Sequence, residues 1–420
     1  MSFKKLDYRW NLVLILFFAA VVNYMTRDTL SIANTTIAEN FHLNAIQMGF
    51  LLSAFMWPYA LASLPAGWFV DKVGMNKVFL FSVFLWSFAA FLGGIAESFT
   101  SLYFVMVLIG IAESPFFIIS GKLCQQFFVK KERGMAASVI NMGPRVANAV
   151  APIILVFLIL LTGWRGMFII VAVLGFIVGC IWLAVYSKEK SKTTANKIME
   201  LENFQVSSIK KRKISYLKLM KHPTMIAMII GNMGTSYVFW VYLTWFPDYL
   251  MKVKHLSLKK TGFIDAIPFM TAIFAVLLGG YISDKLIRKG VSPLKARLIP
   301  IVAACLISGF ASIPVNYVTN LTVVMILITV SIFAYNMIPG IIWALVGDLS
   351  PIEAVGSFGG IQNFANFVGA TLAPIGTGLI LYFSDGNFNF VFITSGIFCI
   401  IGAVSYTFIR RPIKNSEVVL

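Results

Sequence analysis

The sequence predicts an all-α integral membrane protein with twelve transmembrane helices in two six-helix halves. Of its 420 residues, 59% are hydrophobic and only 12% are charged. The apolar residues form long blocks, and the basic residues gather in alternate loops between them. An average soluble globular protein has about 45–50% apolar and about 25% charged residues. The composition therefore excludes a secreted disulfide scaffold, a disordered chain and a conventional cytosolic enzyme.

Each apolar block is long enough to cross a membrane. A helix needs about 20 apolar residues to span a hydrocarbon core of about 30 Å. Backbone polar groups in lipid have no water to bond, so these segments must be helices. The predicted spans are residues 11–33, 47–70, 76–96, 100–122, 134–160, 164–186, 223–250, 262–283, 296–316, 320–346, 353–382 and 388–409.

The placement of charge predicts the orientation. Loops rich in Lys and Arg stay in the cytoplasm, and most basic residues fall on one side of a twelve-helix arrangement. The exception is the outer loop 251–260, which contains several lysines. Both termini are predicted to be cytoplasmic, in a bacterial inner membrane. The net charge of +17 is thus an orientation signal, because it is not clustered as in a nucleic-acid-binding domain.

A basic loop over residues 187–222 separates the predicted halves, 1–186 and 223–420. Such a division is typical of duplicated transporters. The loops after spans two and eight also repeat a Gly-x-x-x-Asp-Lys pattern, in which we expect glycine to let helix ends approach and the charges to bind neighbouring helix ends. The residues of this conformational loop motif are Gly67, Asp71, Lys72, Gly74, Asp284 and Lys285.

These features resemble the major facilitator superfamily, and more narrowly its anion:cation symporter family, which includes bacterial galactonate, glucarate and hexuronate permeases. The resemblance implies alternating access in a monomer that binds a small anion and lies in the lipid bilayer, with no metal, cofactor or nucleic-acid partner. Besides the loop motif, the stretches that carry it are Asn23-Tyr24 with Arg27, Met48-Gly49, Ser53-Ala54-Phe55 with Trp57 and Tyr59, Gly110-x-x-Glu113-x-Pro115, Glu132-Arg133, Gly163-Trp164-Arg165, Leu243-Thr244-Trp245-Phe246-Pro247 and Gln362-Asn363-Phe364.

Few ionisable residues lie inside the spans, where each costs about 2.5–3.5 kcal/mol and usually marks a transport pathway. Span one has a polar face that contains Asn23 and Arg27, with Asp28 on the adjoining face. Glu113 is almost alone on span four, and Arg145 lies on span five. Two arginines suit an anion, since the guanidinium donates a planar pair of hydrogen bonds to a carboxylate. The predicted substrate-binding residues are Arg27, Tyr24, Tyr59, Arg145, Asn232, Trp343, Asn363 and Asn366.

Arg27 has an alternative role as the structural ion-pair partner of Asp28 or Glu113. The resemblance implies that positions matching Arg27, Tyr59, Asn363 and Trp343 line the substrate site, and that the position of Glu113 serves proton coupling. Two departures from the family pattern are Thr26, where an Asp is usual, and Met106, where an Arg is frequent.

These departures lead to two hypotheses. Arg145 could replace the missing arginine as the partner of Glu113, and Asp28 could substitute for the missing aspartate. Glu113 and Asp28 are therefore the predicted proton-coupling residues. All three histidines fall in predicted loops, so no buried imidazole is expected to relay protons.

The predicted function is secondary transport of a small organic anion, such as a sugar acid, imported together with protons. The alternatives are a uniporter or exchanger without proton coupling, and an exporter or antiporter of a metabolite, drug or iron chelator, for which Gly143-Pro144 is partial support. A receptor that binds ligand without flux is a further alternative. An enzyme is not expected, because the sequence has no HExxH and no phosphate-binding glycine loop.

Overall fold

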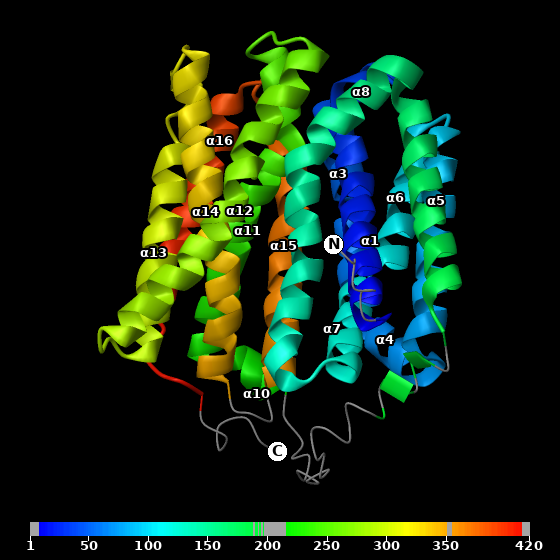
Figure 1. Ribbon diagram of the computed structural model, residues 1–420. Helices are drawn as coiled ribbons and strands as arrows, with labels where there is room; N and C mark the ends of the chain where they lie inside the picture. The colour runs from blue at the N-terminus through cyan, green and yellow to red at the C-terminus, as the bar shows by residue number, and fades with distance from the viewer. Residues whose placement is uncertain are drawn as a thin grey trace, which may run out of the picture. The chain divides into compact units, whose positions relative to one another are not determined.

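The protein is helical throughout the part that the structure describes. Eleven of the described helices are long and apolar enough to span a membrane (Figure 1). One of them, α8 (Lys130–Val185), contains two predicted spans, because Gly163 adopts φ 70° and ψ 174° and breaks the helix. The prediction of an all-α protein with twelve apolar spans is confirmed. The computed structural model describes residues 8–187, 190, 191, 193, 194, 196, 216–350 and 355–413.

The chain forms two compact units. The first unit comprises the described residues of Met1–His42 and Ala54–Ser208, and the second comprises those of Leu43–Ser53 and Ile209–Leu420. The second unit thus includes a short segment from the N-terminal part of the sequence. Most of the basic loop predicted over 187–222 lies outside the described residues, and its last residues form α10 (Tyr216–Lys221).

Close packing of α1 against α8 organises the first unit. A Cβ atom added at Gly143 would lie 2.8 Å from the carbonyl oxygen of Phe17 and 2.7 Å from the Cβ atom of Ala20. Gly143 therefore has a packing role here, which accounts for it without an antiporter motif. Besides α8, the helices of this unit are α1 (Tyr8–Ile32), α2 (Asn34–Asn40), α4 (Met56–Val73), α5 (Met75–Gly94), α6 (Phe99–Glu113) and α7 (Phe116–Phe127).

Predicted spans two and four are each interrupted in the structure. Span two consists of α3 (Ala45–Ser53) and α4, with a break at Ala54 and Phe55. Span four consists of α6 and α7, and Pro115 between them cannot donate a backbone hydrogen bond. The Ser114 hydroxyl at this break donates to the carbonyl oxygen of Ile111 in the last turn of α6 at 2.9 Å. Glu113 is consequently the last residue of α6.

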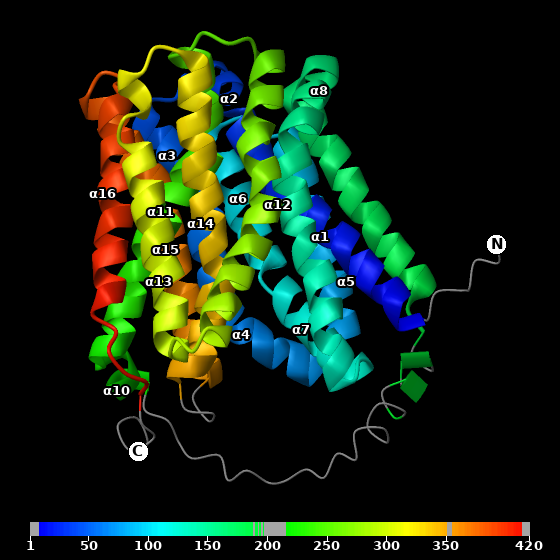
Figure 2. The same cartoon turned by 60° about the vertical axis from the view of Figure 1, so that its left-hand side comes forward.

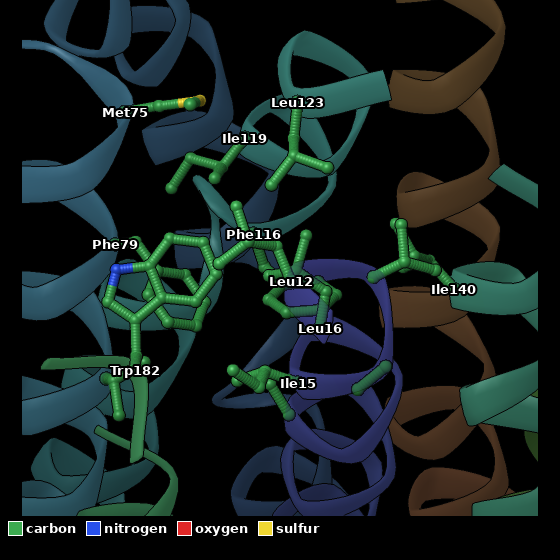
Figure 3. Close-up of a cluster of buried hydrophobic side chains, with 14 of the residues drawn as sticks. Leu12, Ile15, Leu16, Met75, Phe79, Phe116, Ile119, Leu123, Ile140 and Trp182 are labelled. Atoms are coloured by element: carbon green, nitrogen blue, oxygen red, sulfur yellow. The ribbon is translucent and has the colours of Figure 1, made fainter. Parts of the chain in front are cut away.

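A cluster of buried apolar side chains holds α1, α5, α7 and α8 together in the first unit (Figure 3). The rings of Phe79 and Trp182 lie 4.3 Å apart between centroids. Trp182 also donates from Nε1 to Asn76 Oδ1 at 2.7 Å, so its polar atom is satisfied inside the core. The residues labelled in Figure 3 are Leu12, Ile15, Leu16, Met75, Phe79, Phe116, Ile119, Leu123, Ile140 and Trp182.

In the second unit α11 packs against α15 and α16, and α13 packs against α14 (Figure 2). Buried hydroxyls join three of these helices, because Tyr242 lies 2.8 Å from Ser312 Oγ, and Ser312 lies 2.9 Å from Ser331 Oγ. Besides α3 and α10, this unit contains α11 (Pro223–Lys252), α12 (Leu258–Arg288), α13 (Pro293–Ser312), η1 (Val315–Tyr317), α14 (Leu321–Leu349), α15 (Val355–Phe383) and α16 (Phe388–Thr407).

Replacing Tyr242 with phenylalanine is expected to lower the free energy of unfolding by about 1 kcal/mol, because the substitution leaves the buried Ser312 hydroxyl short of one partner. Thermal unfolding of the purified protein measures this loss. Tyr281→Phe is a suitable control, since the Tyr281 ring is exposed. Equal effects of the two substitutions would contradict a stabilising role for the buried hydroxyls.

Two lysines of the segment 251–260, which was predicted as an outer loop, form contacts within the second unit. Lys254 Nζ donates to the carbonyl oxygen of Val318 at 2.8 Å, and partial burial lowers the pKa of Lys254. Lys252 pairs with Asp248 at 3.1 Å. These contacts give the two charges a structural role, so their presence in an outer loop does not conflict with the predicted topology.

Candidate functional site

A buried ion pair joins α1 to the end of α6 in the first unit. Arg27 donates from Nε to Glu113 Oε2 at 2.9 Å, and the exposed fractions of the two side chains are only 4% and 0%. The structural alternative considered for Arg27 is thus present. Glu113 Oε2 is bonded to Arg27, and a pairing of Glu113 with Arg145 stays a prediction. A substrate contact of Arg145 stays a prediction.

Three aromatic rings surround the Arg27 guanidinium. Its Cζ atom lies 4.3 Å from the ring centroid of Tyr24, 4.5 Å from that of Phe55 and 5.0 Å from that of Tyr59. Such contacts stabilise a cation through the negative face of each ring. Tyr24 and Tyr59 were predicted at this site. Phe55 was missed, although it precedes Tyr59 by four residues and so lies on the same helical face.

Parts of this cluster have no hydrogen-bond partner. Arg27 Nη2 and Glu113 Oε1 are buried and have no hydrogen-bond partner. The buried amide of Asn23, one helical turn before Arg27, lies beside the Glu113 carboxylate. Buried polar atoms are almost always hydrogen-bonded to protein or water. The Nη side of the guanidinium is therefore suited to an incoming carboxylate, while its Nε is held by Glu113.

Asp28 is buried on α1, and its Oδ2 atom has no hydrogen-bond partner. The two departures from the family pattern are also buried. Thr26 donates its hydroxyl hydrogen bond to the carbonyl oxygen of Val22 at 2.9 Å, and Met106 lies in the apolar interior. Because Thr26 and Met106 are both neutral, neither position leaves an unpaired buried charge, which would cost several kcal/mol.

The polar residues predicted on the second unit have mixed environments. Asn232 donates from Nδ2 to the carbonyl oxygen of Gln362 at 2.7 Å, and Ser236 donates to that of Asn366 at 2.7 Å. These bonds tie α11 to α15, so Asn232 has a structural role, and its contact with substrate stays a prediction. Asn363 and Asn366 are half-buried, and Trp343 is exposed. Their contacts with substrate stay predictions.

The first copy of the loop motif ties α4 to α7. Asp71 Oδ1 pairs with Lys122 Nζ at 2.7 Å, and Lys122 also donates to the carbonyl oxygen of Val70 at 3.0 Å. Gly74 adopts φ 94°, which explains the need for glycine at this turn. A Cβ atom added at Gly67 would meet no atom of the described residues within 4 Å, so the expected close approach at Gly67 stays a prediction.

The second copy of the motif uses a different partner. Asp284 Oδ1 pairs with Arg297 Nη1 at 2.8 Å, and Arg297 Nε also lies 3.4 Å from Asp348 Oδ2. Lys285 lies 5.6 Å above the ring of Tyr281 instead of pairing with an acid. Each aspartate therefore binds a neighbouring helix within its own unit, but the two copies reach different helices.

Comparison with known proteins decides the family. The model of the Major Facilitator Superfamily matches residues 16–374. The chain belongs to this superfamily. It is 34% identical over 410 residues to the probable L-galactonate transporter of Escherichia coli K12, covering 96% of this chain and 90% of that protein. It is also 31% identical over 434 residues to the probable galactarate/D-glucarate transporter of the same strain, covering 99% and 97%.

A solved structure of another member of the Major Facilitator Superfamily supports the fold. The bacterial homologue of the human lysosomal transporter Spinster superposes with a TM-score of 0.78 at 18% identity, covering 95% of this chain and 96% of that one. The protein is accordingly an integral membrane transport protein of this superfamily and not an enzyme.

Proposed function

We propose that the protein imports a sugar acid together with a proton by alternating access, and that the Arg27–Glu113 pair binds the substrate carboxylate and the proton. The observation that supports this proposal is the buried ion pair whose Arg27 Nη2 and Glu113 Oε1 atoms have no partner. The names of the related galactonate and galactarate/D-glucarate transporters favour the same class of substrate.

The first step of the proposed mechanism is recognition of the carboxylate. The substrate accepts hydrogen bonds from the Nη side of Arg27, and the rings of Tyr24, Phe55 and Tyr59 hold the guanidinium in place. Aromatic faces also pack well against the C–H groups of a sugar acid.

The second step couples substrate to the proton. One guanidinium cannot fully compensate two carboxylates, so substrate binding weakens the bond between Arg27 and Glu113. An uncompensated carboxylate at a fully buried position is costly, and protonation removes that cost. Glu113 then carries the proton while Arg27 carries the substrate. Asp28 is a second buried carboxyl group on the same helix and the proposed reserve carrier.

The charge pattern supports the proposed orientation. Basic residues such as Lys77, Arg133 and Arg288 lie in loops that fall on one side of the twelve-span arrangement. We therefore place these loops and both termini in the cytoplasm of a bacterium, with the protein in its inner membrane.

Uptake into proteoliposomes tests the proposal. Purified protein is expected to accumulate labelled galactonate, glucarate or glucuronate when the outside is acidic, and to acidify the lumen as it does so. Arg27→Lys keeps the charge but loses the planar pair of donors, so it should weaken binding by about ten-fold or more.

Matched controls distinguish the outcomes. Arg288→Lys is the control for Arg27→Lys, because it changes an arginine that forms no ion pair within the part of the chain that the structure describes. Accumulation that is independent of the pH gradient would refute proton coupling. Movement of protons opposite to the substrate would instead identify an antiporter.

A further inference from the structure

A recess of about 440 Å³ opens in the first unit where α4 ends and α5 begins, and it shares no residue with the Arg27 cluster. Two lysines line it and none of its lining residues is acidic. A recess of this size and charge suits an anionic group. The lining residues are Val73, Gly74, Met75, Asn76, Lys77, Lys122, Gln126 and Tyr186.

The two lysines differ in the contacts that their ammonium groups already make within the protein. Lys122 binds Asp71 and the carbonyl oxygen of Val70, so it is held in place at the edge of the recess. Lys77 is exposed and forms no ion pair or hydrogen bond among the described residues. Its ammonium group is therefore available to a ligand. Gln126 and Tyr186 add an amide and a hydroxyl to the same lining.

The backbone at the recess adds to its positive potential. Gly74 is the N-cap residue of α5 and has no side chain to accept from the first amides of the helix, and the first turn contains no acidic residue. Such uncapped N–H groups favour a negative charge nearby. This contribution supports the lysines, which remain the groups that define the site.

An exposed apolar strip leads away from the recess along α4. Val73, which lines the recess, is 45% exposed, and Phe69 and Trp68 on the preceding turn are 47% and 56% exposed. Lys72 Nζ lies 4.6 Å above the Trp68 ring. Tryptophan prefers the interface between lipid and water. A ligand in the recess can thus place a charged head on the lysines and an apolar tail along α4.

We propose that this recess binds the phosphodiester headgroup of an anionic phospholipid, with an acyl chain along the face of α4 that contains Phe69 and Val73. Basic pockets between transmembrane helices bind such headgroups. The apolar strip favours a lipid over a soluble phosphate, which would gain nothing from it. The recess shares no residue with the Arg27 cluster, so it is separate from the proposed substrate and proton sites.

Native mass spectrometry of the delipidated full-length protein tests this site. Phosphatidylglycerol is expected to bind more tightly than phosphatidylcholine, and Lys77→Gln should weaken phosphatidylglycerol binding about five-fold. Gln126→Glu, which places a negative charge in the lining, should weaken it at least as much. Lys289→Gln is the matched control, because Lys289 lies beside the second copy of the loop motif and is exposed.

Three results would overturn the proposal. They are equal binding of the two lipids, unchanged phosphatidylglycerol binding by both Lys77→Gln and Gln126→Glu, and an equal loss in Lys289→Gln. A fourth arm adds inorganic phosphate alone. Saturable phosphate binding that depends on Lys77, without tighter binding of phosphatidylglycerol, would assign the recess to a soluble anion and reject the lipid.

Discussion

Arg27→Gln is expected to lower the free energy of unfolding by about 3–5 kcal/mol and to abolish substrate binding. The substitution leaves the fully buried Glu113 carboxylate without its cation, and removal of one member of a buried ion pair is far more costly than removal of both. The double variant Arg27→Gln/Glu113→Gln should recover much of the stability but none of the transport, because the substrate has lost its guanidinium.

Glu113→Gln separates binding from coupling in the same pair. Arg27 then has no competing carboxylate, so we expect sugar-acid binding to persist while accumulation against a gradient is lost. Isothermal titration measures substrate binding, thermal unfolding measures stability, and proteoliposome uptake measures accumulation. Glu97→Gln is the matched control, since it makes the same change at an exposed carboxylate outside the proposed site and should change stability by less than about 0.5 kcal/mol. Full pH-driven accumulation by Glu113→Gln would show that another group carries the proton.

Gly110→Ala is expected to have the second large effect, although it adds only one methyl group. The new Cβ atom would overlap the carbonyl oxygen of Phe55 and lie 3.2 Å from the amide nitrogen of Tyr59. Both neighbours are backbone atoms, one at the break that precedes α4 and one in its first turn, so they cannot rotate away as a side chain could. We expect a loss of about 1–3 kcal/mol in stability, which is typical of overpacking.

The same substitution should reduce transport by about ten-fold or more, because moving Phe55 and Tyr59 shifts two rings that hold Arg27. Gly121→Ala is the matched control, since a Cβ atom there meets nothing within 4 Å and alanine favours the helix by about 0.4–1 kcal/mol. Melting temperature and initial uptake rate are the measurements. A Gly110→Ala protein with the properties of Gly121→Ala would show that the α4–α6 contact adjusts freely.

The apolar spans and the rare buried charges were predictable because each depends on local sequence. Hydropathy identifies a span without knowledge of its neighbours, and an ionisable residue inside a span stands out by its cost, as Arg27 and Glu113 do. Gly163 also fell between two predicted spans, where the structure breaks α8.

The pairing of these charges could not be predicted in the same way. Arg27 and Glu113 are 86 residues apart, and which carboxylate meets which arginine depends on how α1 and α6 pack. The sequence left Arg145 as an equally plausible partner for Glu113. Phe55 was missed for a related reason. The sequence has 38 phenylalanines, and the contact that assigns this one to the site is with the Arg27 guanidinium, which only the structure shows.

The buried ion pair also determines how the site responds to membrane voltage. Arg27 and Glu113 together carry no net charge. In the proposed cycle a monocarboxylate brings one negative charge as Glu113 loses one, so the loaded pair is neutral as well. Moving a unit charge through 100 mV is worth about 2.3 kcal/mol. Neither the empty pair nor the loaded pair has a net charge for the potential to act on. A dicarboxylate adds a negative charge, and an inside-negative potential opposes its entry.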